Sequence, residues 1–360
     1  MFLKRFFSTY SFGLDISDFS IKLASLKEKE GNLVLSSFGE KRIPKGVIEK
    51  AEIKDSKRLS ILINQLLREA RGEKIDTKYV VASLPEEKAF VRIIQLPKMK
   101  KEEVRGAIKW ELEANIPLSI SDVYYDWKII PYNDPSNVYV LTVAMRKDIV
   151  ERYFQTLLHA GLNPIALEVE SVALVRALIK NYHSFHPIII LDMGISGTGL
   201  TIFSGETICF TSHIPVSGTD LNNAIAKSLN IDLEKAVDLK IKIGLDEKKD
   251  KKVASALRNV VDRLISQVSH YVSYYKSHGE KKYIPDGIIS KILLCGGDSL
   301  LIGLPEYLSF KLKIPTELGN PWVNILKPQI SYIPELPYKR SLAYTTALGL
   351  ALYSFTSGSV

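Results

Sequence analysis

A turn of small residues beside one aspartate is the clearest chemical feature of the sequence. Residues 188–203 contain an apolar run that ends at Asp192, and a second extended run follows the turn. The turn contains four residues suited to binding an anion, which are Gly194, Ser196, Gly197 and Thr198. Glycines let backbone amides approach an anion, hydroxyls add donors, and a carboxylate beside phosphates can hold hydrated Mg²⁺. This spacing predicts a phosphate site, although an ordinary glycine-rich hairpin has the same composition.

A second copy of this pattern occurs near the N-terminus. Residues 12–22 again give an apolar run, an aspartate (Asp15), a turn of small residues and an apolar exit. Each copy is followed by a further hairpin that ends in an Ile-Pro pair, at Ile43-Pro44 and at Ile214-Pro215. Such duplication implies two related lobes, and two aspartate hairpins that face each other can hold a polyphosphate from both sides.

A third element, residues 291–301, is an apolar strand that ends in Gly296 and Gly297. In type and order, the three elements resemble the motifs of the actin-like nucleotide-binding superfamily. The resemblance implies an α/β fold of two duplicated ribonuclease-H-like lobes, with ATP and Mg²⁺ bound between them. It also implies that the paired glycines lie against the purine and the ribose.

Within that superfamily the chain resembles the PilM family of type IV pilus assembly proteins, which is itself similar to the division protein FtsA. The resemblance runs from Gly13 to about Leu352 and includes residues 214–218 and 319–325. It implies a subdomain inserted in the first lobe, and four parts in all. The expected parts are a first-lobe core (1–84, 164–186 and 341–360), a partner-binding insert (85–163), a second-lobe core (187–217 and 287–340) and a helical subdomain (218–286).

The resemblance also assigns roles to single residues. It makes Asp15 and Asp192 the Mg²⁺ ligands and gives Glu170 the role of orienting the attacking water. A glutamate in the first turn of a helix is also favoured simply by the helix dipole. The nucleotide-binding residues that the resemblance implies are Asp15, Ser17, Ser20, Lys22, Asp192, Gly194, Ser196, Gly197, Thr198, Lys240, Gly296, Gly297 and Asp298.

Three positions depart from the family pattern. Ser17 stands where a glycine is usual, Val237 stands where a glutamate near the ribose is expected, and Asp18 adds a negative charge beside the first turn. A like charge at about 4 Å costs about 1 kcal/mol in water and several in a half-buried cleft. Asp18 must therefore point away from the phosphates or help to hold Mg²⁺, and we expect weak affinity and at most slow ATP hydrolysis.

Composition limits the other possibilities. Of the 360 residues, 46% are hydrophobic, which suffices for two lobes, and no apolar run reaches the about 18 residues of a membrane span. The net charge of +8 comes from lysines mixed with acids, which is typical of solvated loops and not of a nucleic-acid surface. Two cysteines in apolar runs and six scattered histidines predict a reduced compartment without a transition-metal site. Residues 1–10 lack the apolar core of an export signal, which predicts a cytoplasmic protein.

Hydrophobic spacing outlines the elements that position these motifs. Residues 85–163 predict a strand, a helix, two strands and a second helix capped by Asp148. Asp232 predicts the start of another helix, and a long apolar repeat over 253–277 predicts a third. Because the insert has no titratable cluster, we expect it to bind a partner, with structural decoration as the alternative.

These features and the resemblance together predict an ATP-binding scaffold of pilus assembly that is recruited peripherally to the inner membrane. The implied partner is the short cytoplasmic N-terminal segment of a PilN-like inner-membrane protein, next to other inner-membrane proteins of the pilus complex and further copies of the chain. Three alternatives stay open. They are an FtsA-like filament-forming division protein, a weak ATPase or small-molecule kinase of the same superfamily, and the cytoplasmic part of a type II secretion assembly protein.

Overall fold

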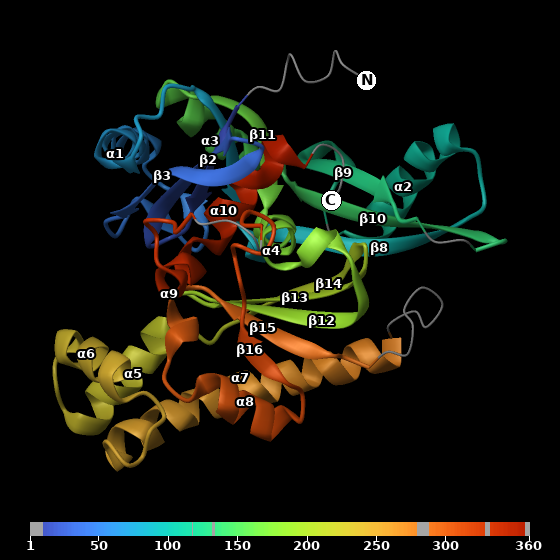
Figure 1. The fold of residues 1–360 in the computed structure, drawn as a ribbon. Coiled ribbons are helices and arrows are strands. Elements are labelled where there is room, and N and C mark those ends of the chain that lie inside the picture. The colour runs from blue at the N-terminus through green and yellow to red at the C-terminus, as the bar shows by residue number, and fades with distance from the viewer. Residues whose placement is uncertain (1–9, 117, 132–133, 279–287, 328–331, 357–360) are drawn as a thin grey trace.

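Two β-sheets with the same strand order form the centres of the two lobes (Figure 1). The computed structural model describes residues 10–116, 118–131, 134–278, 288–327 and 332–356. The first sheet runs in the order β11 (Asn163–Val169), β7 (Tyr79–Leu84), β1 (Phe12–Ile16), β2 (Ser20–Lys29), β3 (Asn32–Arg42) and β6 (Arg71–Gly72). The second runs in the order β16 (Thr316–Leu318), β15 (Lys291–Cys295), β12 (Ser184–Met193), β13 (Thr198–Gly205) and β14 (Thr207–Ile214).

The strand that carries the aspartate has the same neighbours in both lobes. Strand β1 pairs antiparallel with β2 and parallel with β7, while β12 pairs antiparallel with β13 and parallel with β15. Asp15 lies opposite Lys22, and Asp192 lies opposite Gly199 and beside Cys295. Both central strands are apolar because they are covered on both faces. The duplication predicted from the sequence is therefore confirmed.

Helices cover the two faces of the first sheet. On the outer face, α1 (Ser56–Glu69) packs with α3 (Lys147–His159), and Asp55 caps α1 by accepting a hydrogen bond from the Arg58 amide at 2.9 Å. On the inner face, α4 (Glu170–Leu178) packs against α10 (Thr345–Ala351), which continues from the short α9 (Tyr338–Ser341). Figure 1 shows α4 and α10 between the two sheets, where α4 also contacts β13 and β14.

The insert forms a small sheet with its own helix. Strands β8 (Ala89–Pro97), β10 (Asn137–Arg146) and β9 (Val123–Ile129) pair antiparallel in this order, and α2 (Lys101–Asn115) covers them. The predicted succession of strand, helix, two strands and helix is confirmed, while Pro117 lies outside the described residues. The small core of this part comprises Ile94, Leu96, Val104, Ile108, Leu112, Ile116, Val140 and Ala144.

The last helix of the insert, α3, belongs to the core of the first lobe. Its buried residues Ile149, Tyr153 and Leu157 pack in one cluster with Leu59 and Ile63 of α1. The prediction that Asp148 caps α3 is wrong. The residue before the helix is Arg146, which gives no side-chain cap, and its Nε donates to Asp148 within the first turn at 2.9 Å.

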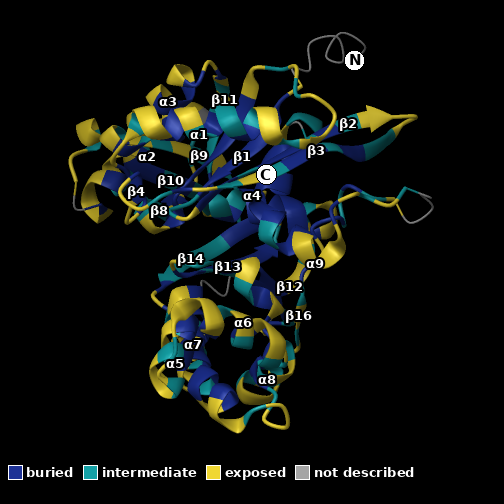
Figure 2. Cartoon of the chain, turned by 90° about the vertical axis from the view of Figure 1, so that its left-hand side faces the viewer, coloured by how far each residue is buried: buried dark blue, intermediate teal, exposed yellow. Residues whose placement is uncertain are grey.

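The helical subdomain lies below the second sheet in Figure 1. It contains α5 (Gly218–Leu229), α6 (Leu233–Ile243) and α7 (Lys251–His278), while α8 (Leu304–Leu312) of the second-lobe core packs against α7 and β16. Asp232 caps α6 as predicted, since it accepts a hydrogen bond from the Lys235 amide at 2.8 Å. Figure 2 shows that these helices bury one side and expose the other, whereas the central strands are buried. Among the described helices, none has the length and apolar content needed to cross a membrane.

Candidate functional site

Asp15 stands at the end of β1 in a buried position opposite a lysine. Its Oδ1 accepts a hydrogen bond from Ser83 Oγ at 3.2 Å, and Ser83 Oγ also accepts from the Ile16 amide at 2.8 Å. Burial raises the pKa of Asp15, and the positive charge of Lys22 opposes that rise. Lys22 Nζ donates to Ser20 Oγ at 2.9 Å. The predicted residues Asp15, Ser20 and Lys22 are therefore adjacent in the structure.

Asp192 occupies the equivalent position in the second lobe. Burial and the negative charge of Asp15 raise the pKa of Asp192 to about 6, again against the attraction of Lys22. Gly296 packs directly on this carboxyl group. Its φ is +85°, and a Cβ there would lie 2.4 Å from Asp192 Oδ1, so only glycine fits this position.

Glu170 completes a cluster of carboxyl groups between the lobes. It is the first residue of α4, and its Oε2 accepts a hydrogen bond from the Glu86 amide at 3.3 Å. Burial raises the pKa of Glu170 well above its usual value, and the charges of Asp15 and Asp192 raise it further. We call Asp15, Asp192 and Glu170 the carboxyl cluster. Its members come from both lobes and from the helix between them.

Asp15 and Asp192 are the members of the carboxyl cluster that offer oxygen ligands to a divalent cation. The negative charge of Asp15 raises the pKa of Asp192, and a divalent cation would relieve this repulsion. In the described ranges no group of three His, Cys, Asp or Glu side chains is arranged to hold a metal ion. Mg²⁺ in nucleotide sites usually takes one or two carboxylates and completes its shell with phosphates and water. The donor set therefore fits Mg²⁺ bound together with a nucleotide.

The two predicted phosphate turns have different internal contacts. In the first, Ser17 Oγ donates to the Ser20 carbonyl at 3.0 Å and closes the turn. In the second, the Gly194 amide donates to the Gly197 carbonyl at 2.9 Å, and the buried Thr198 donates its hydroxyl to the Val216 carbonyl at 2.7 Å.

Ser196 is the exposed side chain at the tip of the second turn.

The predicted adenosine side joins two charged residues. Lys240 Nζ lies 2.5 Å from Asp298 Oδ1, and both side chains are about nine-tenths buried. The Asp298 carboxylate lies against the backbone of Gly218. At Gly297, by contrast, a Cβ would meet no atom within 4 Å, so this glycine borders open space. The ion pair thus lies two residues beyond Gly296, the glycine that packs on the Asp192 carboxyl group.

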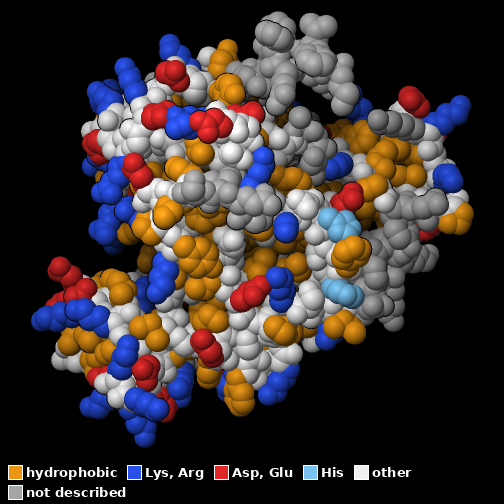
Figure 3. Space-filling model, viewed as in Figure 1, with side chains coloured by type: hydrophobic (Ala, Val, Ile, Leu, Met, Phe, Trp, Pro, Cys, Tyr) orange, Lys and Arg blue, Asp and Glu red, His pale blue; other side chains and the backbone are white. Residues whose placement is uncertain are grey.

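The lobes are separated by an indentation on the left of Figure 3, between the first lobe and α5 and α6. A cavity of about 520 Å³ lies elsewhere, where residues of α7 and α8 meet, and is bordered by residues such as Arg258, Tyr307 and Phe310. It contains no member of the carboxyl cluster. The chemistry of the site therefore coincides with the region between the lobes and not with this cavity.

Two residues of the site had no sequence signal of their own. Ser83 and Glu86 reach the carboxyl cluster only because β7 runs parallel to β1. Their position at the end of a buried strand could have indicated a role, because the carboxyl ends of parallel strands lie together at one edge of a sheet.

Comparisons with known proteins agree with this architecture. A family model described as type IV pilus assembly protein PilM matches residues 13–355. A solved structure described as the PilM-PilN type IV pilus biogenesis complex is 27% identical and covers 96% of this chain and 98% of its own, with a TM-score of 0.79. MreB5 of Spiroplasma citri, solved with AMPPNP, is 13% identical, with a TM-score of 0.54 and 96% of each chain covered.

The cell division protein FtsA of Helicobacter pylori is 26% identical over 107 residues, which are 30% of this chain and 22% of that protein. The match therefore spans about a fifth of the FtsA chain. The two structural likenesses confirm the predicted actin-like two-lobe fold.

Proposed function

Since the chain belongs to the PilM family of type IV pilus assembly proteins, we propose that it is an ATP-binding scaffold in the assembly of a pilus or pilus-like machine. The carboxyl cluster is the main observation that supports ATP binding. Two equivalent hairpins, 177 residues apart at Asp15 and Asp192, bring their carboxyl groups close enough for the negative charge of Asp15 to raise the pKa of Asp192. Like charges that lie close together in a buried site are costly without a ligand, which favours a cation site here.

The nucleotide would lie between the lobes. Asp15 and Asp192 would hold Mg²⁺, the two turns and Lys22 would face the phosphates, and Gly296, with the Lys240 and Asp298 pair, would border the nucleoside. The remaining predicted contacts of this site are Ser17, Ser20, Gly194, Ser196, Gly197, Thr198 and Gly297. Mg²⁺ supplies charge neutralisation to the polyphosphate. The actin-like relative MreB5 was solved with the ATP analogue AMPPNP, which supports a nucleotide ligand.

Hydrolysis would be slow. Glu170 is the one residue that the resemblance assigns to orient water, and Ser17 replaces the glycine that is usual in the first phosphate turn, so few groups would stabilise charge around the γ-phosphate. A bound nucleotide would then stabilise one arrangement of the lobes. Binding alone can contribute about 2.7 kcal/mol at a hundredfold excess over Kd, without turnover.

The partner would be the cytoplasmic N-terminal segment of a PilN-like inner-membrane protein. The solved relative is a PilM-PilN complex, and the small sheet and α2 of the insert have a core separate from those of the lobes. Such a unit can present a peptide-binding surface without disturbing the nucleotide site. Binding this segment would recruit the protein peripherally to the inner membrane beside the other pilus proteins, where copies of the chain could also associate.

Calorimetry tests the nucleotide site. Asp192→Ala should weaken MgATP binding by at least about tenfold, which corresponds to about 1.4 kcal/mol. The exposed Asp76 serves as the matched control, because Asp76→Asn also removes one negative charge from the first lobe. Equal affinities in the Asp192→Ala variant and the wild type would refute the site.

Hydrogen exchange tests the partner surface in the full-length protein. A synthetic peptide with the N-terminal sequence of the PilN protein from the same organism should slow amide exchange within residues 85–163. Protection confined to the second lobe would place the partner elsewhere. Concentration-dependent filaments without peptide binding would favour the FtsA-like alternative.

A further inference from the structure

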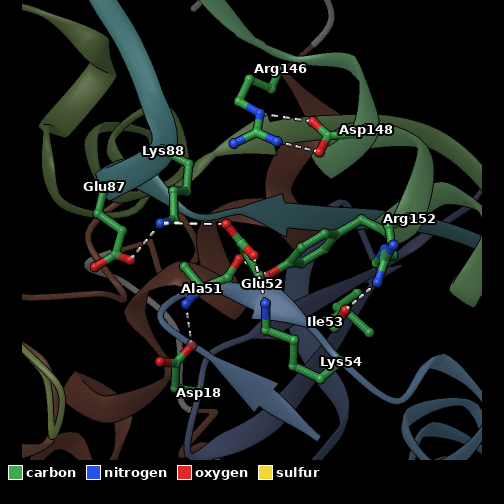
Figure 4. A network of polar contacts seen from close by, with 11 residues as sticks. Asp18, Ala51, Glu52, Ile53, Lys54, Glu87, Lys88, Arg146, Asp148 and Arg152 are labelled. Carbon is green, nitrogen blue, oxygen red and sulfur yellow. Dashed lines mark hydrogen bonds and ion pairs between the residues drawn. The ribbon is translucent and has the colours of Figure 1, made fainter.

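Asp18 does not belong to the carboxyl cluster, although it lies in the first phosphate turn, between β1 and β2. Its Oδ1 accepts a hydrogen bond from the Ala51 amide at 2.9 Å, as Figure 4 shows. Ala51 belongs to the turn between β4 (Ile48–Glu49) and β5 (Glu52–Ile53). The Asp18 carboxylate therefore stabilises the β4–β5 turn and does not face the carboxyl cluster.

The β4–β5 turn has a strained backbone. Lys50 and Ala51 have φ angles of 51° and 60°, and neither is a glycine. Consecutive left-handed residues persist only where neighbouring contacts hold them. Here the Ala51 carbonyl also accepts a hydrogen bond from Tyr153 of α3 at 3.4 Å, and the Ile53 carbonyl accepts one from Arg152 at 3.0 Å. The first phosphate turn is therefore tied to α3 through the β4–β5 turn.

The contacts continue from this turn to the beginning of the insert. Glu52, next to Ala51, lies 3.9 Å from Lys88 Nζ, and Lys88 Nζ lies 3.8 Å from Glu87 (Figure 4). Both residues belong to the 3-10 turn η2 (Glu86–Lys88), and β8 begins at the next residue, Ala89. Because no linker separates η2 from β8, a shift of η2 would be passed directly to the first strand of the insert.

The 3-10 turn η2 also contacts a residue that packs on the second phosphate turn. Glu87 Oε2 lies 3.6 Å from His213 Nε2 on β14. The His213 ring lies directly on Gly197, where a Cβ would come within 2.2 Å of the imidazole. The contact of the His213 ring with Gly197 and its approach to Glu87 thus connect the second phosphate turn with η2.

Glu86, the first residue of η2, contacts the helix between the lobes. The buried Glu86 accepts a hydrogen bond from the Ser171 amide of α4 at 3.0 Å, and its own amide donates to Glu170 at 3.3 Å. Each residue of η2 therefore has its own connection to the candidate site. Lys88 is connected to the first phosphate turn through Glu52, Glu87 to the second phosphate turn through His213, and Glu86 to the carboxyl cluster through Glu170.

We propose that η2 couples the two binding events: occupancy of the nucleotide site moves Glu86–Lys88 and thereby changes the affinity of the insert for its peptide partner. This inference rests on the proposed function, because it needs both ligands. The physical basis is that three independent groups of the site converge on one short turn that continues without a linker into the insert. By reciprocity, peptide binding changes nucleotide affinity by the same factor.

The test measures the affinity of the full-length protein for MgATP with and without saturating PilN-derived peptide. In the wild type the two values should differ by about tenfold, within the usual range of coupling. Glu87→Ala removes the contacts to His213 and Lys88 and should bring the ratio below about twofold, with MgATP affinity in the absence of peptide changed less than about threefold. Glu317→Ala breaks a comparable exposed ion pair with Lys291 in the second lobe and should leave the ratio unchanged.

A second pair of variants separates the hydrogen bond from the charge. Asp18→Ala removes the acceptor for the Ala51 amide and should lower the coupling ratio, whereas Asp18→Asn keeps an acceptor oxygen and should retain it. Hydrogen exchange gives a readout without peptide, since MgATP should slow exchange of residues 86–97 in the wild type and not in Glu87→Ala.

Each result has one meaning. Binding of both ligands with a ratio of one in the wild type, or full coupling in Glu87→Ala, would overturn the role of η2 and leave the proposed function intact. Failure of the wild type to bind MgATP would overturn the proposed function itself, and the coupling with it.

Discussion

Replacing Asp192 by asparagine should stabilise the nucleotide-free protein at neutral pH. Asp192 has a pKa of about 6 in the folded protein against 3.8 for an unperturbed group, because it is buried and faces the negative charge of Asp15. At about 1.36 kcal/mol per pH unit, ionising this group in the folded state costs about 3 kcal/mol. Asparagine has nearly the same shape and carries no charge, so it removes this cost.

The attraction between Asp192 and Lys22 and the hydrogen bond with Cys295 both lower the pKa, so they are already included in this net shift. We therefore expect Asp192→Asn to be more stable than the wild type at pH 7.5, by up to about 3 kcal/mol.

The sign of the pH dependence follows from the direction of the pKa shift. Between about pH 4 and pH 6 the folded wild type holds a proton on Asp192 that the unfolded chain releases. Stability of the wild type therefore falls as the pH rises through this window. Asparagine does not titrate, so the advantage of the variant should be near zero at pH 4 and complete at pH 7.5.

Urea unfolding followed by circular dichroism, at pH 4 and at pH 7.5 and without nucleotide, measures this difference. Asp76→Asn, with an exposed side chain, should show no comparable gain. Addition of MgATP should reverse the order at pH 7.5, because only the wild type can use the site for ligand stabilisation. A variant that is less stable than the wild type at pH 7.5, or a difference that does not change with pH, would refute the reasoning.

Two further predictions concern stability. Lys50 has a φ of 51°, so Lys50→Gly should leave the free energy of unfolding unchanged or raise it by about 1 kcal/mol, whereas Lys50→Val should lower this free energy by about as much. Equal effects of the two substitutions in urea unfolding would argue against the strained turn. Arg176 is buried, pairs with Glu168 at 2.7 Å and donates to the Gly349 carbonyl at 3.0 Å, so Arg176→Ala should cost about 3–5 kcal/mol. Glu168→Gln in the same background should recover part of this loss, since it removes the unpaired charge, and a further loss in the double variant would contradict that explanation.

Much of the site could be predicted from the sequence because its signals are local. Asp15 and Asp192 each end an apolar run and begin a turn of small residues, and the position of a strand end depends on neighbours within a few residues. The start of α6 at Asp232 is local in the same way, because a cap bonds an amide only three residues away. The duplication was visible for the same reason, since both lobes repeat one local pattern.

Only the tertiary structure decided which partner each polar side chain meets. Asp18 bonds the Ala51 amide 33 residues away, Ser83 reaches Asp15 across 68 residues, and Glu86 meets the Ser171 amide across 85. Hydrophobic periodicity predicts which face of an element is buried, but it carries no information on the element that covers that face. For this reason the sequence placed the two aspartates correctly at their strand ends, whereas the links from the site to the insert exist only in the folded chain.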